Sequence, residues 1–197
     1  FNHTGNRAIT LDNSSSGGGV VSNFLVYEMD LTAYTIPIDN LRLKFWYNHH
    51  GDEQNANDRV WVRGSSADLW VEVYNWRSNS NGSGQWQEAD LDIDAALNGA
   101  GQQFTSTTGI RFGQEDDFQA TSLSGTDGLS IDDVSIFEEV APSFAWTTLP
   151  VSTGVSNATI ANPNSTPTTN TTYTVTATDG NTCSNTSAVT VTVNPYP

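Results

Sequence analysis

Short runs in which apolar and polar residues alternate constrain the fold of this chain more than any other feature of its sequence. In the run 41–47 every odd position is apolar, while the even positions include Arg42 and Lys44. A period of two residues is typical of a β-strand with one face in a core. Similar runs, separated by clusters of Gly, Asn, Asp and Ser, predict strands at residues 7–11, 21–29, 59–63, 69–74, 108–112 and 130–137. Residues 89–97 could hold a short turn of helix.

The composition divides the chain into two parts, with Ala141-Pro142 as the joint. Residues 1–140 contain all seven Lys and Arg residues and 21 of the 22 acidic residues, whereas residues 141–197 contain one acid and sixteen threonines. We therefore predict two domains, 1–140 and 141–197, in an all-β chain. Seven or more strands in the first domain fit a jelly-roll or related β-sandwich. In the second domain, alternation predicts strands at 144–147, 171–178 and 187–193.

The charge balance excludes several classes of partner. Seven Lys and Arg residues against 22 Asp and Glu residues give a net charge of −15. Nucleic-acid binding requires a basic face, so it is not expected, and an anionic membrane surface is disfavoured for the same reason. We also expect no insertion into a membrane, because no run approaches the roughly 18 apolar residues of a spanning helix. The chain starts and stops in mid-pattern, which indicates a segment of a longer protein.

The cysteine and histidine residues argue against catalysis. Cys183 is the only cysteine, so an internal disulfide is impossible, and His3, His49 and His50 all lie far from it in sequence. We interpret Cys183 as an inert or intermolecular thiol. His49 and His50 are adjacent and would diverge on a strand, so we interpret them as loop residues and not as a metal pair. No sequence motif of a nucleophile elbow, a phosphate-binding loop or a zinc site is present, and no catalytic residue is predicted.

One carboxylate near the end of the first domain suggests a metal ion. Asp132 precedes Val134 by two residues and Ile136 by four, so in a regular strand it would share their inward face. A buried carboxylate needs a partner, and calcium is suitable because it accepts six to eight oxygen ligands in flexible geometry. The other predicted ligands are in the acidic loop and near the N-terminus: Asp52, Glu53 and Asp12. Alternatively, Asp132 accepts hydrogen bonds from loop amides and no ion is needed.

Two tryptophans indicate a ligand or contact surface. Trp46 shares its strand face with Arg42 and Lys44, and Trp61 lies between Arg59 and Arg63, so both rings should point away from the core. Exposed aromatic rings beside arginines are typical of sugar platforms and protein contacts. The predicted surface comprises Trp46, Trp61, Arg59 and Arg63. In the alternative interpretation, arginine side chains simply stack over these rings and cover the sheet.

Several motifs resemble modules of large secreted surface proteins. The first domain resembles the MAM-like or cleaved-adhesin jelly-roll modules of type IX-secreted adhesins of the Bacteroidota, and the second is similar to their Ig-like or PKD-like repeats. The motifs that carry the first resemblance are 41–47, 49–53, 58–64, 111–114 and the closing segment 127–137; those of the second are 144–146, 162–163, 171–176, 183–184 and 189–193. The resemblance implies a structural calcium ion held by Asp132 or Asp133 in the final strand of the jelly roll.

The resemblance also implies that the Ig-like sandwich is incomplete, because its first strands are missing. A strand or surface from the first domain or from a neighbouring subunit would complete it; alternatively, it is a naturally short sandwich. We expect a non-catalytic structural or adhesive module pair of an extracellular cell-surface protein, an adhesin or filament. Its partners would be neighbouring domains or subunits, or glycans. The alternative is a carbohydrate-binding module attached to a secreted hydrolase.

Overall fold

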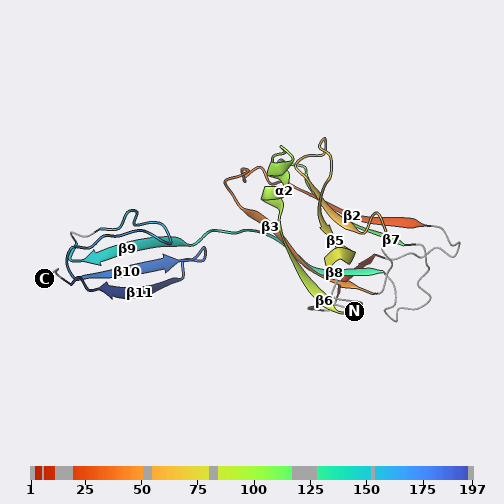
Figure 1. Cartoon of the computed structure of the whole chain (residues 1–197). Coiled ribbons are helices and arrows are strands. Elements are labelled where there is room, and N and C mark those ends of the chain that lie inside the picture. Colours follow the sequence, from red (N-terminus) through yellow and green to blue (C-terminus); the bar gives the residue numbers. More distant parts are fainter. Residues whose placement is uncertain are drawn as a thin grey trace. The chain divides into compact units, whose positions relative to one another are not determined.

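The computed structural model describes residues 3–5, 7–11, 20–50, 55–79, 84–116, 128–151 and 154–194. Within these residues it contains eleven strands and two short helices, which confirms the predicted all-β class (Figure 1). The chain divides into two compact units, Phe1–Glu138 and Glu139–Pro197. The described residues include no helix long and apolar enough to cross a membrane.

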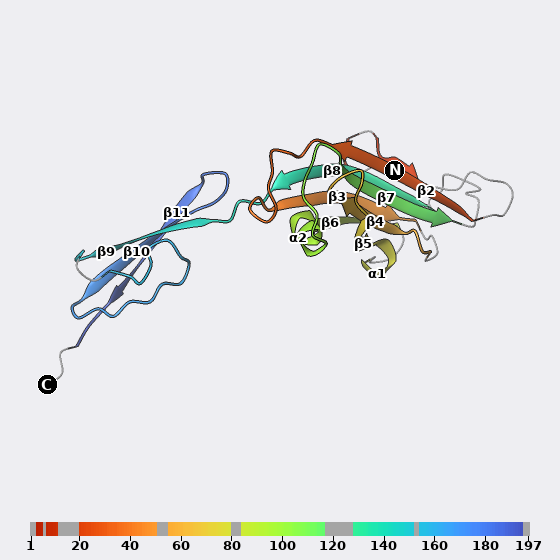
Figure 2. The same cartoon turned by 90° about the horizontal axis from the view of Figure 1, so that it is seen from above.

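The first unit consists of two antiparallel sheets of four strands each (Figures 1 and 2). The first sheet has the order β1 (Ile9–Leu11), β8 (Leu129–Glu138), β3 (Leu41–His49) and β6 (Trp86–Asp92). The second sheet has the order β2 (Val21–Met29), β7 (Thr108–Asp116), β4 (Arg59–Arg63) and β5 (Val71–Asn75). The two helices are α1 (Trp76–Asn79), which follows β5, and α2 (Ile93–Gly99), which follows β6.

The core of the first unit is built around the ring of Phe45 from β3. This side chain is fully buried, and its ring centre lies 5.2 Å from that of Phe112 in β7 and 5.6 Å from that of Trp76. The indole Nε1 of Trp76 donates a hydrogen bond of 2.7 Å to the backbone oxygen of Gly113, so the buried polar atom is satisfied. The four odd positions of 41–47 are all buried, as the alternation predicts.

A β-bulge in β8 changes the face on which Asp132 lies. Lys44 pairs with Ser135 but Trp46 pairs with Asp132, so Phe45 faces two residues of β8 where regular pairing would give one. Asp133 has a positive φ of 51°, the left-handed region that Asp and Asn tolerate better than most residues.

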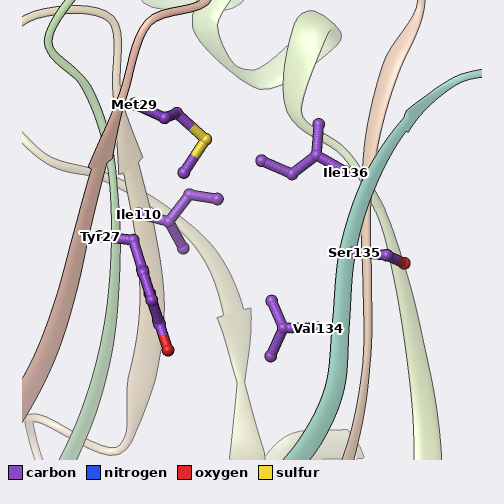
Figure 3. Close-up of a pocket in the computed structure, with 6 residues that line it drawn as sticks. All are labelled: Tyr27, Met29, Ile110, Val134, Ser135 and Ile136. Carbon is purple, nitrogen blue, oxygen red and sulfur yellow. The ribbon is translucent and has the colours of Figure 1, made fainter.

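The prediction that Asp132 points inward is therefore wrong. Because the bulge adds one residue, Asp132 lies beside Trp46 on the outer face of the first sheet, whereas Val134 and Ile136 line the space between the sheets. Figure 3 shows the side chains of Val134 and Ile136 directed toward Met29 and Ile110, and that of Ser135 directed away from them.

The second unit is one sheet of three strands, β9 (Ser143–Leu149), β10 (Thr171–Thr178) and β11 (Ser184–Val191), with β10 in the middle (Figure 1). The segment 154–170 packs against the β9 side of this sheet. The backbone N–H of Trp146 donates to the oxygen of Ala158, and its indole Nε1 donates to the oxygen of Ile160, both at 2.9 Å. The hydroxyl of Ser165 lies 2.5 Å from that of Tyr173.

The region 86–99 differs from the sequence prediction. Residues 86–92 form the strand β6, and the helix occupies Ile93–Gly99 where a turn was expected at 89–97. Asp92 caps the helix, because its carboxylate accepts a hydrogen bond of 2.8 Å from the backbone N–H of Ala95.

Candidate functional site

The outward face of the second sheet carries a cluster of aromatic rings around one arginine. The guanidinium carbon of Arg111 lies 4.0 Å from the ring centre of Trp61, 4.8 Å from that of Trp70 and 4.9 Å from that of Phe24. The guanidinium carbon of Arg63 lies 4.4 Å from the ring centre of Trp70. We call these five residues the Arg111 cluster. Three strands contribute to it, because Phe24 belongs to β2, Arg111 to β7, and Trp61 and Arg63 to β4.

Two glycines of β7 make room for the rings. Gly109 and Gly113 lie two residues before and after Arg111, so they share its face of the sheet. A Cβ atom at Gly109 would lie 3.0 Å from the Trp70 ring, and one at Gly113 would lie 2.6 Å from the Trp61 ring. The rings therefore lie close to the β7 backbone on both sides of Arg111. A side chain at Gly113 would require a shift of its neighbours, and one at Gly109 would be a tight fit.

The charge of Arg111 is held differently from the charges of four other cationic side chains of the unit. Four cationic side chains form ion pairs: Arg42 with Asp90 at 2.7 Å, Lys44 with Glu88 at 3.1 Å, Arg59 with Glu72 at 3.3 Å, and Arg63 with Glu28 at 2.5 Å. Arg111 has no carboxylate partner in the described part of the chain, and its contacts there are the three rings. Burial lowers the pKa of Arg111, and the neighbouring charge of Arg63 lowers it further.

The predicted surface residues are distributed over both sheets. Trp61 lies on the outward face of the second sheet and Trp46 on that of the first, and both are half-buried. Arginine stacking over Trp61 does occur, but the arginine is Arg111, which the sequence analysis did not single out. Arg59 and Arg63 bind Glu72 and Glu28 instead. The signal for Arg111 was the spacing Gly109-x-Arg111-x-Gly113.

The pair Asp132 and Asp133 binds the N-terminal segment 3–5. The Asp132 carboxylate accepts hydrogen bonds from the backbone N–H groups of His3 at 2.9 Å and Thr4 at 3.2 Å. The Asp133 carboxylate lies 2.9 Å from Nδ1 of His3 and accepts a 2.6 Å bond from the Thr4 hydroxyl. These bonds, that of His3 first, lower the pKa of Asp133. The His3 ring stacks on Trp46 with 3.8 Å between ring centres, so Trp46 is a support for this segment.

In this arrangement the carboxylate oxygens of the pair are occupied by hydrogen bonds within the protein. Each of the four carboxylate oxygens of the pair has a hydrogen-bond partner in the protein, because Oδ1 of Asp132 accepts from the backbone N–H of Asp133. Calcium requires oxygen ligands, and the groups around the pair are mainly hydrogen donors. The described residues contain no group of three or more His, Cys, Asp or Glu placed to hold a metal. Asp12, Asp52 and Glu53 lie outside the described residues, so the calcium ion stays a prediction.

His49, His50 and Asp58 are buried polar residues. The interpretation of the histidines as loop residues is wrong for His49, whereas His50 follows the end of β3 and lies outside any strand or helix. His49 is the last residue of β3, and both rings are nearly inaccessible. Nε2 of His50 lies 2.9 Å from the hydroxyl of Ser130, and burial lowers the His50 pKa. The Asp58 carboxylate accepts bonds from the backbone N–H groups of Asn55 at 2.6 Å and Glu115 at 2.8 Å. No pattern in the sequence around Asp58 indicates this structural role.

Each unit also has an apolar groove. In the first unit, a groove of about 270 Å³ lies between β2, β7 and β8, and Figure 3 shows the residues that line it: Tyr27, Met29, Ile110, Val134, Ser135 and Ile136. In the second unit, a groove of about 200 Å³ is lined by Trp146, Val155, Pro163, Ser165, Tyr173, Val189 and Val191. Both grooves are apolar surfaces suited to contacts with another macromolecule.

Cys183 is exposed and forms no disulfide.

Comparison with known proteins adds no identification. No protein-family model matches the chain, and no curated protein matches it either. The family resemblance therefore rests on the motifs in the sequence.

The substitution Asp132→Asn tests the role of the carboxylate pair. We expect it to lower the free energy of unfolding by about 1 kcal/mol, because charged hydrogen bonds to the N-terminal segment are weakened. The loss should be the same with calcium and with EDTA, as measured by urea unfolding. Glu138→Gln, an exposed change in the same strand, is the control. If EDTA destabilises the unsubstituted chain but not the Asp132→Asn variant, and calcium restores the stability, the pair binds calcium as the sequence predicts.

Buried His50 should make stability depend on pH. Its pKa is lowered from 6.5 in the folded state, so as pH falls the unfolded chain binds a proton first. The contribution of neutral His50 is thus complete above pH 6.5 and decreases as pH falls below this value. We expect a slope of up to about 1.4 kcal/mol per pH unit in urea unfolding, and a smaller slope in His50→Gln. Equal slopes in the two proteins would contradict this role.

Proposed function

We propose that the chain is a non-catalytic structural and adhesive module pair of a large secreted cell-surface protein, and that its second unit makes contacts with neighbouring subunits or domains. The observation that carries this proposal is the exposed apolar side of the second unit. Val189 and Val191 line its groove but remain 57% and 39% exposed. Exposed apolar surface around a groove is typical of a contact site.

The strand β11 supports the same conclusion. All eight of its residues are exposed, and it lies at the edge of its sheet. Its sequence has no charge, proline or glycine, and its pairing with β10 is regular along the whole strand. Natural proteins normally protect a long edge strand with charges, prolines or bulges. An edge without these features is suited to pairing with a strand or surface of a partner.

The distribution of charge favours contacts through the second unit. From residue 139 onward the only charged side chains are Glu139 and Asp179, whereas the first unit carries almost all of the net charge of −15. Two second units therefore repel each other little, while the acidic first units stay solvated. The extracellular setting and a calcium ion are parts of the proposal that rest on the motif resemblance.

The double substitution Val189→Lys and Val191→Lys tests this contact surface. We expect the intact chain to associate as its concentration rises in sedimentation velocity, and the double variant to associate at least about tenfold more weakly, because it loses two apolar side chains from the contact. The matched control is Leu69→Lys, which adds a charge at a residue of the first unit that is 85% exposed. An unsubstituted chain that stays monomeric up to its solubility limit would contradict the proposal.

A second candidate function is carbohydrate binding, and the Arg111 cluster is the observation that favours it. Rings that lie close to Gly109 and Gly113 give an aromatic surface beside a cation, and Phe24 and Val26 beside them are 43% and 45% exposed. Aromatic rings pack against the C–H faces of sugars, and polar groups next to them fix the orientation.

Trp61→Ala tests this second candidate. We expect the intact chain to bind glycans on an array and the variant to lose this binding while circular dichroism shows a retained fold. The ring supplies apolar contact area, so a loss of about tenfold or more is expected. Glycan binding that is unchanged in Trp61→Ala would place the sugar elsewhere.

A further inference from the structure

The Arg111 cluster holds a positive charge that the described residues do not neutralise. The other cationic side chains on this face, Arg59 and Arg63, each pair with a carboxylate. Arg111 is partly buried against three rings, and its buried Nε atom has no hydrogen-bond partner in the described part of the chain.

The surroundings of Arg111 act on its charge in opposite directions. Burial and the adjacent Arg63 lower the pKa of Arg111, while its contacts with three rings favour the cationic form. The guanidinium is placed in advance by rings that lie over Gly109 and Gly113. A group fixed in this way loses little conformational freedom when a ligand binds.

The side chains of the cluster favour a ligand that has a carboxylate next to an apolar face. A guanidinium presents a planar fork of N–H donors that matches a carboxylate, and a carboxylate would offset the repulsion between Arg111 and Arg63. Phe24 and Val26 offer exposed apolar surface next to this fork. The net charge of −15 repels dense polyanions, so a ligand with spaced carboxylates is favoured over one with a phosphate backbone.

We propose that the outward face of the second sheet binds an acidic saccharide, in which Arg111 pairs with the carboxylate of a uronic acid residue and Trp61, Phe24 and Val26 contact its ring. This inference rests on the second candidate function and names its ligand class. The cluster is centred on Arg111 in β7, which has strands on both sides, whereas peptides are usually bound along strand edges or in grooves. An acidic peptide is therefore the less favoured occupant.

The test is titration calorimetry of the intact chain with trigalacturonic acid and with its methyl ester, which has the same rings without the charges. We expect tighter binding of the acid. Arg111→Gln should weaken binding of the acid by about tenfold or more and leave binding of the ester unchanged, because it removes one charged hydrogen-bonding pair. Arg111→Lys keeps the charge but loses the fork, so its affinity for the acid should fall between the two. The control is Arg42→Gln, which makes the same change in net charge on the outer face of the other sheet.

The outcomes separate this inference from the function on which it rests. If the acid and the ester bind equally and Arg111→Gln has no effect, carbohydrate binding stands and the acidic-sugar assignment is wrong. If neither compound binds and the glycan array is also blank, both are wrong. If a hexaglutamate peptide binds as tightly as the acid, the occupant is a protein carboxylate and the saccharide assignment is wrong. Should Arg111→Gln not fold, the Arg111→Lys variant and ligand-dependent shifts of the indole N–H signals of Trp61 and Trp70 decide the question.

Discussion

The single extra residue at the bulge in β8 determines which side chains the first unit buries. Ile131 and Ile136 are five residues apart, an odd number, yet both contribute to the space between the sheets. Regular alternation would send one of them to the solvent. By adding one residue opposite Phe45, the bulge keeps both in the core and leaves Asp132 and Asp133 on the outer face, where they bind the N-terminal segment.

Alternation was sufficient to predict most strands, because every second side chain of such a strand faces the core and is apolar. The run 41–47 is the clearest case, and the strands at 21–29, 59–63 and 171–178 have the predicted bounds. The face of Asp132 could not be predicted in this way. One bulge adds a residue to the strand, so the odd-numbered and even-numbered positions exchange faces on its two sides. Its sequence signal was weak: an Asp at the position that needs a positive φ.

The candidate site was only partly predictable for a similar reason. Period and charge placed Trp61 on an outward face, but the partner of its ring comes from β7, about 50 residues further along the chain. Contacts of this kind depend on the strand order, which alternation does not encode. The spacing of Gly109 and Gly113 around Arg111 was visible in the sequence, yet its meaning depends on the rings that neighbouring strands place there. The burial of His49 and His50 could not be predicted, because polar residues at the end of a strand are also typical of an exposed loop.

The near absence of charge in the second unit has a consequence for temperature. A contact made through Val189, Val191 and the uncharged edge of β11 would rest on the removal of apolar surface from water, and that driving force weakens on cooling. Such a contact would also become tighter in salts that are excluded from protein surfaces, whereas one between charged faces would loosen as ions screen it. A surface protein assembled in this way would hold together best in warm, saline water and would come apart most readily in the cold.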